Sequence, residues 1–330
     1  MSMINPVVSV IVPVYGVEKL IERCSISLFE QTYDNIEYIF VNDCTKDNSI
    51  GILKEIIQRY PSKKTKIKII NHSVNMGLAA SRNTGVDNSS GVFILHVDSD
   101  DYVDYGLVEA LVTKQRETNA DIVSCDFFYH YRDYVKKSTI QKNDDARTYL
   151  NSLLLGENLT NIWGRLIRSS IYRDNNIFEN VGHNMAEDLQ TIPRLFYYAK
   201  NVAFVDNFYY HYCKDNENAY TYDFDEKKRI ALDYSYEYLY SFFSDKDSEL
   251  LINLKAGELK SLINELIDIT RIGGHVLHYK VIAQRIKNAE NLSKKRLSLL
   301  YRELQKYCQY RMIIFLVSKA GLFISKVRSS

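Results

Sequence analysis

The sequence predicts an α/β protein whose mostly parallel sheet is flanked by helices and followed by a helical C-terminal region. Over the first 130 residues, short runs of β-branched and aromatic residues alternate with segments whose apolar residues recur at helical spacing. From residue 227 onward the patterns are helical only. Strands separated by helices indicate parallel pairing with right-handed crossovers, an arrangement found in many nucleotide-binding proteins.

The first strand, at residues 7–14, is a nearly continuous run of β-branched residues, as expected for a strand buried on both faces. Four more strands are expected at residues 36–41, 67–70, 93–97 and 122–125. Helices are expected between them at residues 18–31, 49–60, 78–86 and 107–115. Further helices are expected at residues 189–198, 250–269, 276–286 and 297–304.

Composition excludes several classes of protein. Lysine and arginine (42) nearly balance aspartate and glutamate (41), so no overall field would recruit nucleic acid. The five cysteines are scattered and form no CxxC pair, which favours reduced thiols over disulfides or a zinc site. The N-terminus leads into a strand without a signal-peptide pattern, and no stretch approaches the ~20 apolar residues of a membrane span. We therefore expect a cytoplasmic protein.

Three carboxylates follow the strand at residues 93–97, in the tetrapeptide Asp98-Ser99-Asp100-Asp101. The carboxyl end of a strand is where ligands bind in an open α/β sheet. Carboxylates this close repel one another unless a cation joins them, and a divalent metal with oxygen ligands is the usual solution. One interpretation is an Asp-x-Asp pair that holds a metal against a diphosphate. The other is a polar turn with an aspartate as helix N-cap.

Two standard nucleotide signatures are absent from the sequence. The turn after the first strand, residues 13–18, has one glycine where a dinucleotide fingerprint needs three. The chain contains no GxxxxGK[ST] phosphate loop. A bound nucleotide would therefore depend on side chains and a metal more than on a glycine-rich loop.

Four motifs in the same order and spacing resemble glycosyltransferase family 2. They are Pro13-x-Tyr15, Val41-Asn42-Asp43-Cys44-Thr45-Lys46-Asp47, Asn75-Met76-Gly77-Leu78-Ala79-Ala80-Ser81-Arg82-Asn83 and Asp98-Ser99-Asp100-Asp101. The resemblance continues through Asn161-Ile162-Trp163-Gly164-Arg165-Leu166, Glu187-Asp188 and Tyr210-His211-Tyr212, and covers roughly residues 7–220. It implies an inverting enzyme with a GT-A fold, Rossmann-like and mostly parallel.

The resemblance also implies how the chain is divided. Residues 1–220 would form the catalytic domain, with a nucleotide-binding half at 1–130 and an acceptor half at 131–220. Residues 221–330 would form a helical C-terminal region with a basic amphipathic tail.

The donor nucleotide would be bound by residues that follow the first four strands. They are Pro13, Tyr15, Glu18, Asp43, Asn75, Arg82 and Asp98. An exposed Tyr15 ring can stack on a base, and Asp43, expected in an exposed loop, can accept the imide N–H of uracil. Arg82, early in its helix, can meet a diphosphate bidentately. Each residue also has a structural alternative. Tyr15 would pack against the first helix, and Arg82 would be a solvated helix arginine. Asp43 would be a turn residue that caps the helix beginning near residue 49, although Asp47 is the better candidate for that cap.

The metal would be Mn²⁺ or Mg²⁺, and the resemblance assigns Asp100 to it and Asp98 to the ribose or the metal. Such an ion stabilises the charge that develops as the nucleoside diphosphate departs. His211 is a further candidate for the metal or the phosphates. Its favoured alternative is a histidine with satisfied hydrogen bonds on a β-hairpin.

An acceptor hydroxyl must lose a proton as it attacks, so a carboxylate base is needed. The resemblance assigns this role to Asp188, with Glu187 and Trp163 on the acceptor side. The alternative is that Glu187 and Asp188 merely stabilise a helix N-terminus. One carboxylate base without a carboxylate nucleophile implies single displacement with inversion.

The C-terminal tail, residues 304–330, has five basic residues and no acidic residue. Apolar residues accompany them, as in an interfacial helix attracted to anionic lipid. That would place the enzyme at the inner face of the cell membrane. A terminal helix docked on the protein is the equal alternative.

Together these features predict an inverting, metal-dependent glycosyltransferase of the hexosyl or N-acetylhexosaminyl class. The favoured donor is a UDP-sugar, and the acceptor is a saccharide or a lipid-linked acceptor in cell-surface polysaccharide synthesis. The alternatives are a nucleotidyltransferase acting on sugar phosphates, which would need a triphosphate loop, and a nonenzymatic nucleotide-sugar-binding module, in which Asp188 would be dispensable.

Overall fold

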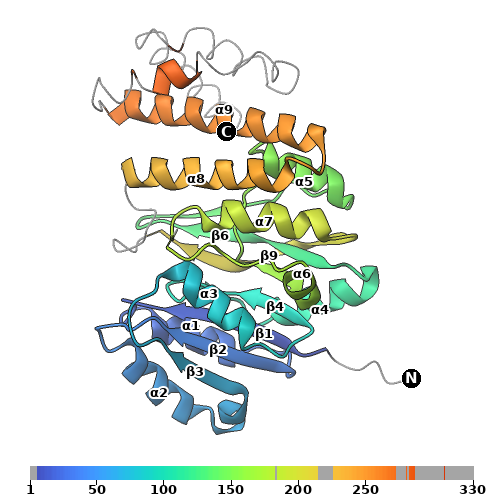
Figure 1. Cartoon of the computed structure of the whole chain (residues 1–330). Coiled ribbons are helices and arrows are strands. Elements are labelled where there is room, and N and C mark those ends of the chain that lie inside the picture. Colours follow the sequence, from blue (N-terminus) through green and yellow to red (C-terminus); the bar gives the residue numbers. More distant parts are fainter. Residues whose placement is uncertain are drawn as a thin grey trace. The chain divides into compact units, whose positions relative to one another are not determined.

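The computed structural model describes residues 6–182, 184–214, 226–272, 280, 282–286 and 308. The chain divides into two compact units (Figure 1). The first comprises residues 1–150 and 159–235, and the second comprises residues 151–158 and 236–330. The boundary expected at residue 220 falls within residues 215–225, outside the described residues, and the division into functional halves stays a prediction.

The first unit is built on a mixed sheet that, in the described residues, has nine strands in the order β3-β2-β1-β4-β8-β6-β9-β5, with β7 paired to β6. The strands are β1 (Val8–Val14), β2 (Ile36–Asn42), β3 (Ile67–Asn71), β4 (Phe93–His96), β5 (Tyr102–Val103), β6 (Ile122–His130), β7 (Val135–Ser138), β8 (Arg165–Arg168) and β9 (Val202–Cys213). The pairings give β1, β2, β3, β4, β6 and β9 one direction and β5, β7 and β8 the other. The mostly parallel α/β fold expected from the sequence is therefore confirmed.

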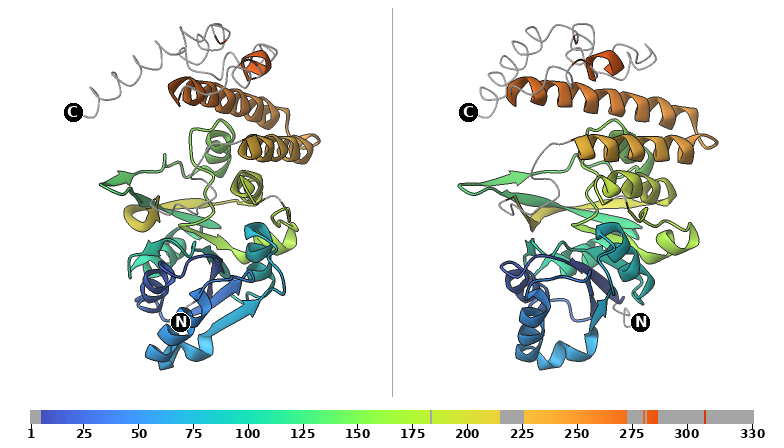
Figure 2. Two further views of the ribbon diagram at one scale, coloured as in Figure 1. Left: turned by 90° about the vertical axis from the view of Figure 1, so that its left-hand side faces the viewer. Right: turned by 60° about the vertical axis from the view of Figure 1, so that its left-hand side comes forward.

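Helices flank this sheet and continue the chain into the second unit (Figure 2). They are α1 (Ile21–Phe29), α2 (Ser49–Arg59), the 3-10 helix η1 (Pro61–Lys66), α3 (Leu78–Asp87), α4 (Leu107–Thr118), α5 (Ala146–Leu154), α6 (Ser169–Asp174), α7 (Glu187–Tyr198), α8 (Glu226–Phe243) and α9 (Ser248–Ile272). Helix α3 packs against β1 and β2, whereas α4 packs against β6 and β9.

The core of the first unit centres on β1, all of whose residues are buried. This agrees with the unbroken β-branched run, because a central parallel strand has no solvent face. Gly85 of α3 lets the helix approach closely, since a Cβ there would lie 2.2 Å from Ile11 Cγ2. The close packing of α3 on β1 fixes the position of Arg82, which lies one turn earlier in that helix.

Two features of the sheet differ from the expected series of parallel strands. Strand β8 lies between β4 and β6 and is antiparallel to both. Strand β6 extends to His130, beyond the expected end at residue 125, because it also pairs with the outer parts of β9 and β7. Local periodicity shows neither feature, since both depend on pairing between segments far apart in the sequence.

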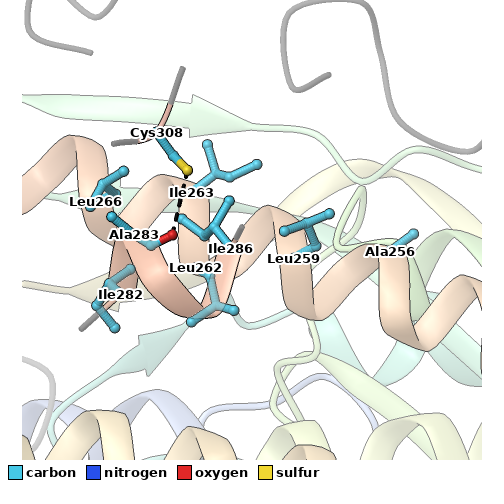
Figure 3. Close-up of a cluster of buried hydrophobic side chains, with 9 residues drawn as sticks. All are labelled: Ala256, Leu259, Leu262, Ile263, Leu266, Ile282, Ala283, Ile286 and Cys308. Carbon is cyan, nitrogen blue, oxygen red and sulfur yellow. Dashed lines mark hydrogen bonds between the residues drawn. The ribbon is translucent and has the colours of Figure 1, made fainter. Parts of the chain in front are cut away.

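The second unit has its own apolar core, shown in Figure 3. One face of α9 packs against residues 282–286 and Cys308, in a buried cluster of Ala256, Leu259, Leu262, Ile263, Leu266, Ile282, Ala283, Ile286 and Cys308. The Cys308 thiol donates a hydrogen bond of 3.4 Å to the Ala283 carbonyl. Cys308, the one described residue of the tail that we expected either to bind membrane or to dock, is buried in this cluster. Residues 309–330 lie outside the described residues, so membrane contact there stays a prediction.

Within the described ranges, no helix has both the length and the apolar character needed to cross a bilayer.

Candidate active site

The loops that follow β1 and β2 are joined by hydrogen bonds at the carboxyl edge of the sheet. Thr45 Oγ1 accepts from Gly16 N over 2.9 Å, and Asp47 Oδ2 accepts from Glu18 N over 2.9 Å. The Glu18 carboxylate in turn accepts from Asn48 N over 3.1 Å. These contacts give Glu18 a positioning role between the two loops, whether or not it also touches a nucleotide.

Pro13 and Tyr15, the first predicted nucleotide-binding residues, lie on either side of the end of β1. Pro13 is buried within the strand. Tyr15 has 46% of its surface exposed, so its ring is open as expected. Stacking of Tyr15 on a base stays a prediction.

Asp43 is buried, with only 3% of its surface exposed, so the expectation of an exposed loop residue is wrong. Its Oδ1 accepts from Met76 N and bonds His72 Nδ1, both over 2.8 Å, while Oδ2 accepts from Gly77 N over 2.7 Å. An ionised carboxylate has about four acceptor positions, so these three bonds leave capacity for about one more. Asp43 thus holds the turn before α3, and any contact with a base stays a prediction.

That turn contains Asn75, which is exposed, and Gly77, which has a φ of +90°. Only glycine adopts this conformation readily, and a Cβ at Gly77 would also lie 2.1 Å from the Asn184 side chain. Asn184 Oδ1 accepts from Ala79 N over 3.2 Å. The start of α3 is therefore fixed both by Asp43 and by Asn184 from the segment before α7.

Arg82 lies at the centre of a cluster of four carboxylates, with 2% of its side chain exposed. Its Nη1 lies 2.8 Å from Glu187, 2.9 Å from Asp188 and 3.5 Å from Glu179, and its Nη2 lies 3.0 Å from Asp98. Both terminal nitrogens thus face protein carboxylates in this structure. Arg82 therefore positions these carboxylates in this structure, and its bidentate contact with a diphosphate stays a prediction.

Burial and repulsion by neighbouring carboxylates raise the pKa values of Glu179, Glu187 and Asp188, while Arg82 opposes the rise. Burial raises the pKa of Glu187 to about 7, and it raises the pKa of Glu179 well above its usual value. Burial, reinforced by the charge of Asp98, also raises the pKa of Asp188. A carboxylate with a raised pKa is a better proton acceptor, which suits the predicted base.

Asp188 lies in the first turn of α7, yet its side chain bonds outside that helix. Its Oδ1 accepts from Arg82, and its Oδ2 accepts from Ile162 N over 3.1 Å. The N-cap position, Ala186, makes no side-chain capping bond. The geometry therefore favours a site role for Asp188 over simple stabilisation of the helix N-terminus.

The three carboxylates in the turn after β4 lie in different environments. Asp101 is fully buried, and it accepts from the Tyr210 hydroxyl over 2.8 Å and from Cys213 N over 2.7 Å. Asp98 and Asp100 are partly exposed. Asp101 thus anchors the turn to β9, while Asp98 and Asp100 remain the candidates for metal and ribose.

The donor set fits a divalent cation that is shared with a substrate. In the described part of the chain, no group of three or more His, Cys, Asp or Glu side chains is arranged so that it could hold a metal ion. Mg²⁺ and similar ions commonly use one or two carboxylates together with water and substrate phosphates. Asp98 and Asp100 supply such a pair of carboxylates.

His211, the further metal candidate, has both ring nitrogens engaged. Its Nδ1 lies 2.8 Å from His130 Nε2, and its Nε2 lies 3.1 Å from Asp104 Oδ1. The ring stacks on Tyr102 with centroids 4.2 Å apart, and burial lowers the pKa of the imidazole. His211 thus has satisfied hydrogen bonds, which is the alternative that we favoured. It does not lie on a β-hairpin, however, because β9 pairs with β6 in parallel.

Trp163 and Glu187, the predicted acceptor-side residues, are both buried. Trp163 stacks on Tyr210 and Tyr212 with centroid distances of 4.4 and 5.1 Å. Glu187 faces Arg82. Both side chains therefore support the site through buried contacts with its other residues. Direct contact of either residue with an acceptor stays a prediction.

Sequence reasoning missed Glu179, His72 and Asn184. Glu179 follows Phe178, and a single glutamate after an apolar residue has no distinctive spacing. His72 and Asn184 contact Asp43 and the α3 turn from distant positions. Only the tertiary structure brings these three residues to the site.

Two surface cavities lie on the first unit, both away from the carboxylate cluster around Arg82. One of about 390 Å³ is lined by α4 and the middle of β9, and one of about 420 Å³ lies along α1 and α2. Neither cavity includes Asp98, Asp100 or Asp188, but Glu18, a predicted nucleotide-binding residue, lines the second.

Comparison with known proteins gives the family. The family model described as "Glycosyl transferase family 2" matches residues 9–186, more than half of the chain. The chain is 32% identical over 223 residues to the uncharacterized glycosyltransferase EpsJ of Bacillus subtilis, covering 65% of this chain and 62% of EpsJ. It is 32% identical over 219 residues to the putative glycosyltransferase EpsH of the same organism, covering 63% of this chain and 61% of EpsH. The match thus spans about three fifths of these curated relatives.

Solved structures support the fold at lower identity. The crystal structure of S. aureus TarS 1-349 in complex with UDP-GlcNAc matches with a TM-score of 0.60 and 19% identity, covering 96% of this chain and 91% of that chain. The mannosyltransferase PcManGT from Pyrobaculum calidifontis, in complex with GDP-Man and Mn²⁺, matches with a TM-score of 0.53 and 13% identity, covering 95% and 87%. The fold is therefore GT-A-like. By the extent of the family-model match, the chain belongs to glycosyl transferase family 2.

Proposed function

We propose that this protein is an inverting, metal-dependent glycosyltransferase that moves a hexosyl or N-acetylhexosaminyl group from a nucleoside diphosphate sugar to a saccharide or lipid-linked acceptor. A UDP-sugar is the proposed donor, in line with the UDP-GlcNAc bound in the TarS structure. Cell-surface polysaccharide synthesis is the proposed setting.

One observation carries the proposal: Arg82 joins Asp98, at the carboxyl end of β4, to Asp188, at the start of α7. The first carboxylate belongs to the proposed donor side and the second is the proposed base. A single guanidinium holds both, so the two parts of the reaction are fixed within one cluster. Such preorganisation places reacting groups in position before the reaction begins.

Asp188 would act as the general base. The acceptor hydroxyl transfers its proton to the Asp188 carboxylate as its oxygen attacks the anomeric carbon. The bond between that carbon and the diphosphate oxygen breaks on the opposite face, so the configuration inverts. Burial raises the pKa of Asp188, which increases its proton affinity, while Arg82 and Ile162 N hold it in place.

Asp100 and Asp98 would hold the cation. When bound, Mn²⁺ or Mg²⁺ would offset the charge on the departing diphosphate. Tyr15 would stack on the base, while Asp43 and Asn75 would shape the base pocket through the turn before α3. Pro13 and Glu18 would support the loop that carries Tyr15.

Thermal-shift measurements with UDP, GDP, ADP and CDP, each with and without Mn²⁺, test this proposal. We expect UDP with Mn²⁺ to give the largest rise in melting temperature, because a ligand that binds only the native state stabilises it. We also expect slow release of UDP from UDP-sugars. If no diphosphate shifts the melting temperature and no UDP-sugar is turned over, the proposal fails.

A further inference from the structure

A row of tyrosine rings leads away from the proposed site along β6 and β9. Tyr212 of β9 lies 5.7 Å from Tyr129 of β6 between ring centroids. Tyr129 lies 6.0 Å from Tyr131, and Tyr131 stacks on Tyr134 at 4.5 Å. We call these four residues, Tyr212, Tyr129, Tyr131 and Tyr134, the tyrosine track.

The inner end of the tyrosine track packs against residues of the proposed site. Tyr212 stacks on Trp163, whose preceding residue Ile162 donates its N–H to Asp188. Trp163 also stacks on Tyr210, whose hydroxyl donates to Asp101 and accepts from Asp98 N. The aromatic packing is thus continuous from the Asp98–Asp101 turn and the Asp188 contact to the end of β6.

The outer end of the track lies on the β6–β7 hairpin, which Figure 2 shows running out to the side of the sheet. Tyr131 N donates to the Tyr134 carbonyl over 2.9 Å and closes the turn. Tyr129, Tyr131 and Tyr212 are partly exposed, and Tyr134 is 57% exposed. Strands β6 and β9 run in the same direction as β1, β2 and β4, so their carboxyl ends leave the sheet at the edge that holds the proposed site.

The track carries positive charge. Lys214 Nζ lies 4.8 Å above the Tyr129 ring and 5.5 Å above the Tyr131 ring. Lys136 pairs with Tyr129 across the β6–β7 ladder, and paired residues project from the same face of a sheet. A face of tyrosine rings with lysine amines suits a ligand that has both flat apolar surfaces and acidic groups.

We propose that the tyrosine track binds the acceptor as an extended oligosaccharide that carries acidic groups. This inference rests on the proposed function. The C–H face of a pyranose packs on an aromatic ring, and the hydroxyls around its rim can bond to tyrosine hydroxyls. Lys214 and Lys136 would meet carboxylates or phosphates of the chain. The terminal sugar would then lie at Trp163, with its hydroxyl toward Asp188.

The test measures binding of a panel of oligosaccharides to the full chain by calorimetry. The panel contains chitohexaose, a hyaluronan hexasaccharide and a galacturonate hexamer. We expect the wild type to bind at least one acidic member. The double variant Tyr131→Ala/Tyr134→Ala should raise its dissociation constant by about tenfold, equivalent to about 1.4 kcal/mol, and Lys214→Gln should weaken acidic members more than chitohexaose.

Tyr105→Ala is the matched control, because Tyr105 is 54% exposed but lies outside the track. UDP binding and UDP-sugar hydrolysis should be unchanged in all these variants, which separates this inference from the proposed function. If the wild type binds no panel member, or the double variant binds as the wild type does, the track is not an acceptor site. If the double variant instead loses binding to phosphatidylglycerol vesicles and keeps saccharide binding, the hairpin contacts membrane and the inference fails.

Discussion

Arg82 Nη1 donates to Asp188 Oδ1 over 2.9 Å, so the proposed base is held by helix α3 and not by its own helix α7. The same guanidinium contacts Asp98. Movement of α3 would therefore displace the proposed base and the donor-side carboxylate together.

Arg82→Met should destabilise the fold by about 3–5 kcal/mol, the usual cost of removing one partner from a buried ion cluster. Urea unfolding measures this free energy. The control is Arg59→Met, because Arg59 pairs with Glu22 on the surface with both side chains more than half exposed. The control should lose less than about 1 kcal/mol. Equal losses in the two variants would show that the Arg82 cluster does not stabilise the fold.

Asp188→Asn should lower the transfer rate by roughly 10²–10⁴-fold, the usual contribution of a positioned general base. Affinity for UDP and Mn²⁺ should stay close to that of the wild type, because the proposed role of Asp188 is on the acceptor side. Asp174→Asn, an exposed aspartate at the end of α6, is the control. Normal turnover of Asp188→Asn would favour the helix-stabilising alternative, and lost UDP binding would place Asp188 on the donor side.

Asp100→Ala should abolish both transfer and donor hydrolysis, because stabilisation by a metal ion is worth several kcal/mol. Steady-state rates across a titration of Mn²⁺ would show the effect, with Asp87→Ala, exposed at the end of α3, as the control. Full activity of the wild type in excess EDTA would contradict the metal assignment even if the variant were inactive.

Asp43→Ala should destabilise the protein by about 2 kcal/mol, because it leaves the buried N–H of Gly77 and the partly buried N–H of Met76 without an acceptor. It should also weaken UDP binding, since the turn before α3 loses its support. Urea unfolding and calorimetric titration measure the two effects. If UDP binding falls and stability does not, Asp43 would contact the base directly and contribute little to the turn.

Glu187 should make stability depend on pH. Its pKa is raised to about 7 in the folded state, from 4.5, so between these values the folded state binds more protons than the unfolded state. Stability from this group is therefore full below pH ~4.5 and is lost as pH rises through about 7. The melting temperature of Glu187→Gln relative to wild type should rise between pH 5 and pH 8. A difference that is constant with pH would show that Glu187 titrates normally.

Strands β1 to β4 and β6, the helices between them and the mostly parallel sheet could be predicted because their signals are local, whereas β5, β7, β8 and β9 were not predicted. The insertion of β8 and the burial of Asp43 could not, since each depends on partners about 30 or more residues away, such as Leu95 for Leu166 and Met76 for Asp43. The motifs identified Asp98, Arg82 and Asp188 as separate site residues. That Asp98 and Asp188 both contact the Arg82 guanidinium could be seen only in the tertiary structure. Charge alone does not specify which carboxylates pair with an arginine.

The reversed direction of β8 has a consequence for how such a chain can diversify. Because β8 runs against β4 and β6, the segment that leads into it, from β7 to Trp163, returns to the same edge as the loops after β1 and β2. Changes in the length of this segment would leave those loops and their hydrogen bonds untouched. Under the proposed function, recognition of the molecule that receives the sugar can therefore evolve while the proposed nucleotide-binding loops stay constant.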